Sequence, residues 1–215
     1  MATTAYDTTT DRAYKVGPLN ELDNWKVHED DCDIRGWNLF TADGQKIGEV
    51  ETLIADTEEK EVRYVEVELD DSINKYRDLT YRNQINPSYR SHFGKDDDDH
   101  ILIPIGLISI DKNNKKVIAS SNLTTTTFAS GPRYRGSRTT AIVPAQELTV
   151  ARYYSDLDNT YRNTYTDEEY DYETFESSPY NIRRKFYSTD FFNSNRYWQR
   201  YNNPRMAGAQ TGGIA

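Results

Sequence analysis

The chain has 215 residues and a formal net charge of −9, from 26 basic and 35 acidic side chains. This length favours one domain with an extension, or two small domains. A general phosphate-binding surface needs clustered Lys and Arg to release counterions, so the acidic balance argues against a nucleic-acid partner. The single cysteine, Cys32, excludes an intrachain disulfide and leaves too little sulfur for a cysteine-based zinc site.

The N-terminal residues 1–17 are rich in Thr and Asp and have no periodicity, so we interpret them as a flexible arm. They have neither the basic nor the apolar region of a secretory signal. The longest apolar run, Ile101 to Ile110, is too short to span a bilayer as a helix. We therefore expect no transmembrane segment and a cytoplasmic protein.

A short helical turn and a β-hairpin are predicted next. Over residues 19–25 an apolar side chain recurs every third position, which indicates one helical turn. Residues 37–41 alternate as in a strand, Asp43–Gly44 is a strong tight-turn signal, and residues 47–54 make the return strand. Gly48 inside that strand indicates a bulge or a close approach of another backbone.

A strict period of two over residues 62–69 predicts a strand with one buried face. Residues 70–99 are polar with scattered aromatics, and we interpret them as a long loop inserted between two strands. A loop of this length is unusual and often functional. Its tip is the acidic run Asp96–Asp99.

The aliphatic run over residues 100–110 predicts a strand that is buried on both faces. Pro104 cannot donate a ladder hydrogen bond, so it requires an edge, a bulge or a strand end. Residues 111–115 form a turn in this interpretation, and residues 116–120 form a closing strand. Short strands at this spacing are typical of a small barrel or sandwich.

The C-terminal part changes character, since residues 151–215 hold ten of the 17 tyrosines. Helices are predicted over residues 144–157 and over residues 166–175, the latter opened by a capping box. Disordered tails avoid aromatics, whereas Tyr, Trp and Arg are enriched at the cores of interfaces. We therefore predict an interface made of Tyr153, Tyr154, Tyr187, Phe191, Phe192, Tyr197, Trp198 and Tyr201.

One candidate cation site combines His92, Asp96–Asp99 and His100, since carboxylates and imidazole are suitable ligands. Four consecutive like charges normally repel one another and stay solvated. We therefore favour a solvated loop tip, and we assign no metal and no cofactor to the chain.

A second acidic cluster occupies residues 29–33. Paired carboxylates can do acid–base chemistry, but no nucleophile or oxyanion donor accompanies them, so we favour a surface turn. A deep pocket lined by His28, Asp31 and Asp33 would instead favour an enzyme. The aspartates beside Cys32 are expected to raise the pKa of its thiol, which opposes reactivity.

Two basic and aromatic stretches could stack on single-stranded nucleic acid. Arg133, Arg135 and Arg138 flank Tyr134, and residues 183–185 precede an aromatic. Given the overall acidity, we favour pairing of these cations with carboxylates of the same chain.

Several of these motifs resemble the PRC-barrel domain, which occurs in the photosynthetic reaction centre H subunit and in a ribosome maturation factor. The motifs are D-I-R-G-W (33–37), D-G-Q-K-I-G-E-V (43–50), V-R-Y-V-E-V (62–67) and H-I-L-I-P-I-G (100–106). The resemblance covers roughly residues 14–120. It implies a six-stranded barrel used for protein–protein contact without catalysis. The H subunit carries an N-terminal membrane helix that this sequence does not show, which argues against a photosynthetic role.

We thus predict a mainly β fold, a small PRC-type β-barrel with an irregular, partly helical, aromatic-rich C-terminal extension. The predicted divisions are an arm over residues 1–17, a barrel domain over residues 18–125 and an extension over residues 126–215. The predicted function is a non-enzymatic structural protein that associates with itself, up to a filament or a large homo-oligomer. The alternatives are an adaptor that docks on a ribosomal or membrane-associated complex through the barrel and, third, an enzyme.

Overall fold

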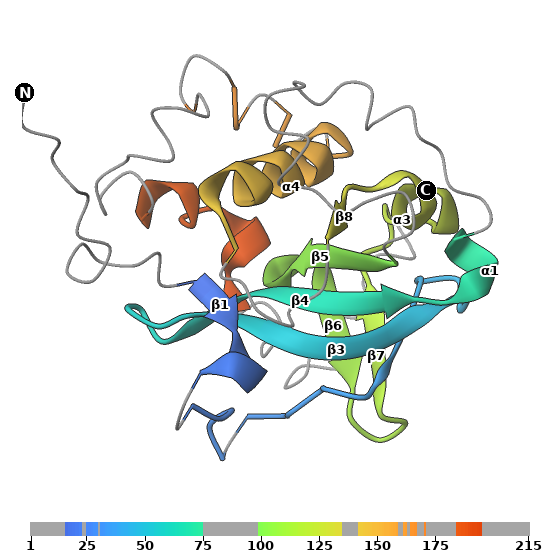
Figure 1. Cartoon of the computed structure of the whole chain (residues 1–215). Coiled ribbons are helices and arrows are strands. Elements are labelled where there is room, and N and C mark those ends of the chain that lie inside the picture. Colours follow the sequence, from blue (N-terminus) through green and yellow to red (C-terminus); the bar gives the residue numbers. More distant parts are fainter. Residues whose placement is uncertain are drawn as a thin grey trace, which may run out of the picture.

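The computed structural model describes residues 16–22, 25–29, 31–74, 99–134, 142–158, 161–162, 164–166, 170 and 184–194. In this part of the chain, eight strands form one mixed sheet, and helix α4 (Pro144–Asp156) lies across one side of it (Figure 1). The fold is therefore mainly β, as predicted, with few helices.

The sheet has the strand order β6-β7-β2-β3-β4-β5-β8, and β1 pairs separately with β3. The pairing of β2 with β7 is parallel, and the remaining pairings are antiparallel. The strands are β1 (Val16–Pro18), β2 (Asn38–Phe40), β3 (Lys46–Asp56), β4 (Glu61–Leu69), β5 (His100–Pro104), β6 (Ile108–Asp111), β7 (Lys116–Ala119) and β8 (Arg133–Tyr134).

The described strands do not close into a barrel, which corrects the predicted architecture. β6 and β8 lie at opposite ends of the strand order, and no described strand joins them. The predicted single strand over residues 100–110 is in fact β5 and β6, separated by a 3-10 helix, η3 (Ile105–Leu107). Pro104 ends β5, so of the three positions that were expected for it, an edge, a bulge or a strand end, it occupies a strand end.

The predicted hairpin is confirmed as β2 and β3. Its turn contains Gly44 with a φ of +88°, a conformation that suits glycine. At Gly48 a Cβ atom would lie 2.0 Å from the carbonyl oxygen of Glu68 on β4. The expected close backbone approach is therefore present at this position.

The strand β4, between β3 and β5, is buried on both faces, whereas its alternation predicted one buried face. Arg63, Tyr64, Val65 and Glu66 are each less than 9% exposed. The second face is covered by the C-terminal part of the chain, which contributes η4 (Asp190–Phe192), a 3-10 helix in contact with β4. The alternation of residues along a strand reveals which side chains share a face. Whether that face is buried depends on the segments that pack against it.

Of the helices described, two were predicted and the others were not. The first turn is present as η1 (Leu19–Glu21), a 3-10 helix, and α4 matches the predicted helix over residues 144–157. The unpredicted helices are α1 (Asp71–Asn74), α3 (Thr125–Ser130) and the 3-10 helices η3 and η4. The residues 75–98 of the long loop and most of the predicted helix over residues 166–175 lie outside the described residues. None of the described helices is long and apolar enough to cross a membrane.

Candidate functional site

The predicted interface residues divide into two groups in the structure. Five of them are buried inside the chain itself, at 1–8% exposure: Tyr153, Tyr154, Tyr187, Phe191 and Phe192. The other three, Tyr197, Trp198 and Tyr201, lie outside the described residues, so their role stays a prediction.

Several buried aromatics of the C-terminal segment cluster between α4 and the sheet. Phe186 lies at the centre of this cluster, with ring centroids 5.1 Å from Tyr187 and 5.2 Å from Phe192. Phe192 in turn meets Tyr64 of β4 at 5.2 Å in an edge-to-face arrangement. Such pairs contribute about 0.5–1.5 kcal/mol beyond their buried area. The aromatic cluster, as we call it, consists of Tyr64, Tyr161, Tyr165, Tyr170, Phe186, Tyr187, Phe191 and Phe192.

Buried polar contacts connect the aromatic cluster to helix α4 on one side and to the sheet on the other. The Tyr187 hydroxyl donates a hydrogen bond to the carboxylate of Glu147, a fully buried residue of α4. On the other side, the Arg63 guanidinium lies 4.5 Å from the Tyr187 ring centroid and 3.3 Å from a carboxylate oxygen of Asp56. Burial, followed by the Glu147 charge, raises the pKa of Tyr187 well above its usual value. These contacts link β3, β4, α4 and the C-terminal segment.

The C-terminal segment packs against η3, the 3-10 helix between β5 and β6. A Cβ atom at Gly106 of η3 would lie 1.9 Å from the Asp190 carbonyl oxygen and 2.7 Å from that of Phe191. The backbone of η4 thus rests directly on η3, and only glycine permits this approach. This contact positions the residues that follow η4, including Ser194.

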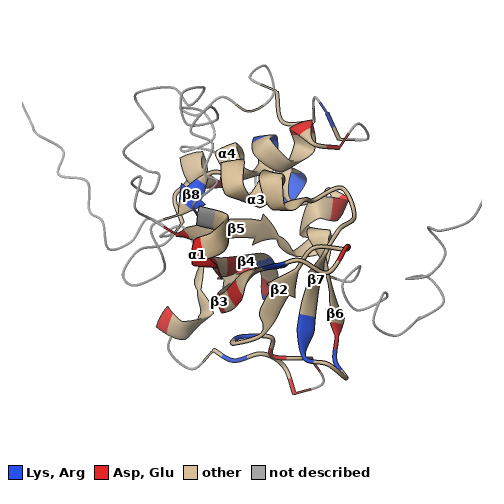
Figure 2. Cartoon of the chain, turned by 90° about the vertical axis from the view of Figure 1, so that its right-hand side faces the viewer, with Lys and Arg blue, Asp and Glu red and all other residues tan. Residues whose placement is uncertain are grey.

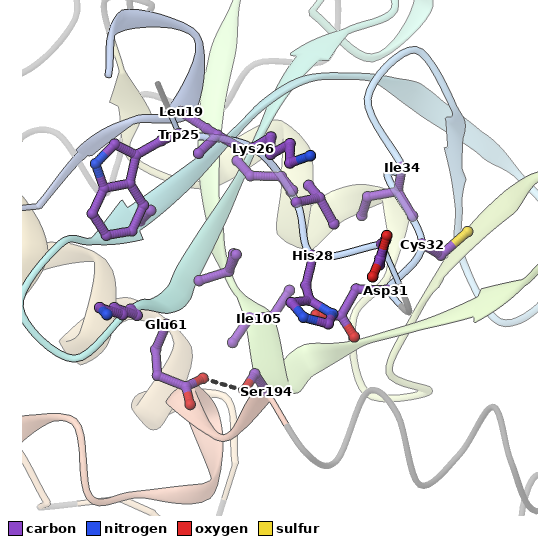
Figure 3. A pocket seen from close by; sticks show the side chains of 16 residues that line it. Leu19, Trp25, Lys26, His28, Asp31, Cys32, Ile34, Glu61, Ile105 and Ser194 are labelled. Carbon is purple, nitrogen blue, oxygen red and sulfur yellow. Dashed lines mark hydrogen bonds between the residues drawn. The ribbon is translucent and has the colours of Figure 1, made fainter. Parts of the chain in front are cut away.

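Ser194 lines a groove with a volume of about 630 Å³ (Figure 3). The groove lies between the segment 25–34, the start of β4 and η3. Figure 3 shows Glu61 and Ser194 along one wall, with Trp25 and Lys26 on the opposite side. Its apolar lining residues are Leu19, Trp25, Val27, Ile34, Leu53, Ala55, Val62 and Ile105.

The Ser194 hydroxyl donates a hydrogen bond to the Glu61 carboxylate, which holds the C-terminal segment against β4. Both residues also line a second, smaller hollow of about 310 Å³ that is bordered by Arg63 and Tyr187. The Ser194–Glu61 contact therefore separates the two hollows and forms a wall of the groove.

The ionisable groups of the groove only partly match the predicted acid–base set. His28 and Asp31 line the groove, but Asp33 does not. The Asp33 carboxylate instead accepts a hydrogen bond of 2.9 Å from Nε of Arg35. That bond, more than any other contact, holds the pKa of Asp33 below its usual value. The carboxylate thus remains charged and engaged in a local ion pair away from the groove.

Cys32 also lines the groove. The pKa of its thiol is raised, as predicted, but the principal cause is burial, and Asp33 contributes less. The nearby Lys112 charge acts in the opposite direction. A protonated thiol is a poor nucleophile, so this environment does not activate Cys32.

The candidate cation site is only partly within the described residues. Nδ1 of His100 lies 2.8 Å from Asp99, and its Nε2 lies 3.9 Å from the buried Glu66. Over the described ranges no group of three or more His, Cys, Asp or Glu side chains is arranged to hold a metal ion. His92 and Asp96–Asp98 lie outside those ranges.

Two residues of the predicted basic stretches, Arg133 and Arg184, contact their own chain. Arg133 is buried and donates hydrogen bonds of 3.0 Å to the carbonyls of Phe128 and Ala129 at the end of α3. Arg184 lies 3.9 Å from Glu59. In the view of Figure 2, acidic and basic residues are interspersed around the described part of the molecule. Arg135, Arg138 and Arg183 fall outside the described residues.

Comparison with known proteins identifies a domain family over most of the strands and part of the groove. The family model of the PRC-barrel domain matches residues 27–122, which run from the groove segment through β7. The match does not include β1, α4 or the aromatic cluster's C-terminal members. No curated protein is significantly similar to the chain.

Proposed function

Because residues 27–122 carry a PRC-barrel domain, we propose that this chain is a non-enzymatic assembly protein that associates with copies of itself. The observation that carries the proposal is the groove beside Trp25. It offers an apolar surface on a domain whose family resemblance implies protein contact. Trp25, Val27 and Val62 are only partly buried there. Partly exposed tryptophans in such hollows are typical anchors of protein interfaces.

The polar lining of the groove suits contact better than catalysis. His28, Glu29 and Asp31 are exposed side chains among its lining residues. Half of the lining residues are apolar, and a mixture of apolar and polar side chains is typical of a protein interface.

The symmetry of the contact would decide the size of the assembly. A contact that both copies make reciprocally across a two-fold axis closes at a dimer, whereas a head-to-tail contact that is not reciprocal continues into a ring or a filament. The proposal therefore includes filament growth only if the contact through the groove is not reciprocal.

The test is a mass measurement by light scattering on the full chain and on two variants of equal charge change. Val62→Glu places a carboxylate in the groove, and Thr126→Glu places one on the exposed surface of α3. We expect the wild type and Thr126→Glu to exceed the monomer mass of 24.9 kDa, and Val62→Glu to approach it. A wild type that stays monomeric at all concentrations would sink the proposal. A monomer that recovers a stoichiometric foreign partner would favour the adaptor alternative.

A further inference from the structure

We propose that the groove of one copy receives residues 195–201 of a second copy. This inference rests on the proposed self-association and names the two surfaces that meet. The segment reads Asn-Arg-Tyr-Trp-Gln-Arg-Tyr and contains the three predicted interface residues Tyr197, Trp198 and Tyr201.

The path of the chain supports this pairing. Ser194 lines the groove and is held there by its hydrogen bond to Glu61, so residue 195 starts at the groove wall. An extended chain spans at most about 3.4 Å per residue, which places Trp198 within about 14 Å of Ser194. If a two-fold axis passes close to Ser194, each segment starts beside the groove of the other copy, and no long linker is needed.

The chemistry of the segment fits the groove. Tyr, Trp and Arg are the residues most enriched among interface hot spots, and five of the seven residues are of these types. The apolar lining around Trp25 and Ile105 can take an indole ring, and the Glu61 carboxylate beside Ser194 can pair with an arginine of the segment. Lys26 and Lys60 also line the groove, so apolar contact, more than net charge, is the main attraction.

Cys32 gives a direct probe, since it is the only cysteine of the chain and it lines the groove. One partner is the wild type, which carries a thiol only in the groove. The other is a Cys32→Ser/Gln199→Cys variant with a size tag, which carries a thiol only in the segment. Gln199 is chosen because its replacement leaves the aromatic and basic side chains in place. A short bis-maleimide can then join groove to segment only between two copies.

We expect a mixed-size cross-linked pair as the main product when the two proteins are combined. The matched control is Cys32→Ser/Thr126→Cys, with its thiol on the exposed surface of α3, which should give at least tenfold less of the mixed pair. In a separate mass titration, Trp198→Ala should weaken self-association about 30-fold, and Asn202→Ala should change it less than about threefold.

The outcomes separate this inference from the proposed function. If the wild type is oligomeric but the mixed pair does not form, the groove–segment contact is wrong and self-association stands. If the wild type is monomeric, both fail. A single chain that carries both Cys32 and Gln199→Cys tests whether the groove is occupied by the segment of its own chain. If it cross-links within itself and forms no cross-linked pair, the segment covers its own groove, and the contact between copies is overturned.

Discussion

The sheet and the aromatic cluster are both buried, but different forces hold them. In the sheet, Ile54, Val65 and Ile103 are fully buried aliphatic side chains on neighbouring strands. Aliphatic burial contributes in proportion to area and has little directional preference. In the aromatic cluster, Phe186 and Phe192 are equally buried, yet both also pack on Tyr187, whose hydroxyl is hydrogen-bonded.

These hydroxyl contacts fix the position of the C-terminal segment on the sheet. The Tyr165 hydroxyl lies 2.7 Å from that of Thr189, and the Tyr161 hydroxyl donates a bond of 2.9 Å to Asp190. A high density of tyrosine therefore need not mean an exposed arm. Here the described aromatic residues between positions 161 and 192 pack into the core of the sheet, and the proposed contact of this segment with a partner is confined to residues 195–201.

The largest effect is expected from Phe192→Ala, which removes a ring that is 1% exposed and packs on Tyr64. Loss of a buried Phe costs about 3–5 kcal/mol, so we expect urea unfolding to show a loss of about 4 kcal/mol in a single transition. Leu157→Ala is the control, since Leu157 is 39% exposed. A Phe192→Ala protein whose sheet unfolds at the wild-type urea concentration would show that the aromatic cluster is not part of the core.

A slightly smaller effect is expected from Gly106→Ala. The new methyl group would meet the Asp190 carbonyl oxygen at 1.9 Å, so η4 must move away from η3. Overpacking of this kind costs typically 1–3 kcal/mol, and we expect the upper end of that range, about 3 kcal/mol, in denaturant unfolding. Gly17→Ala in β1 is the matched control, because no atom lies within 4 Å of a Cβ built there. Equal stability of the two variants would contradict the close contact of η3 with η4.

Features encoded by neighbouring residues could be predicted from the sequence. The tight turn at Asp43–Gly44, the strand end at Pro104 and helix α4 each depend on a backbone preference or a short periodic pattern. The helix α3 was missed although it has a local signal, a capping box between Thr124 and Thr127.

Features made by distant residues could not be predicted. The bond between Tyr187 and Glu147 spans 40 positions, and that between Ser194 and Glu61 spans 133. The groove depends on the second of these, so no spacing in the sequence marks it. The alternative acid–base set of His28, Asp31 and Asp33 is incomplete in the structure for a more local reason. Asp33 pairs with Arg35 two positions later, and that spacing was a signal that could have removed it from the set.

The smallest effects compare two buried tyrosine hydroxyls of the same region. Tyr187→Phe removes the hydrogen bond to buried Glu147, and loss of a partner from a buried charged group costs about 2 kcal/mol. By contrast, no described residue hydrogen-bonds the hydroxyl of Tyr64, which is fully buried on β4.

Tyr64→Phe should therefore leave the free energy of unfolding unchanged or raise it by about 1 kcal/mol, because the native state no longer buries a hydroxyl without a partner. Both variants keep the aromatic ring, so the difference between their urea midpoints isolates the hydroxyl. If Tyr64→Phe is as destabilising as Tyr187→Phe, hydroxyl bonding does not explain how the aromatic cluster is held. The two regions would then be stabilised alike, by burial alone.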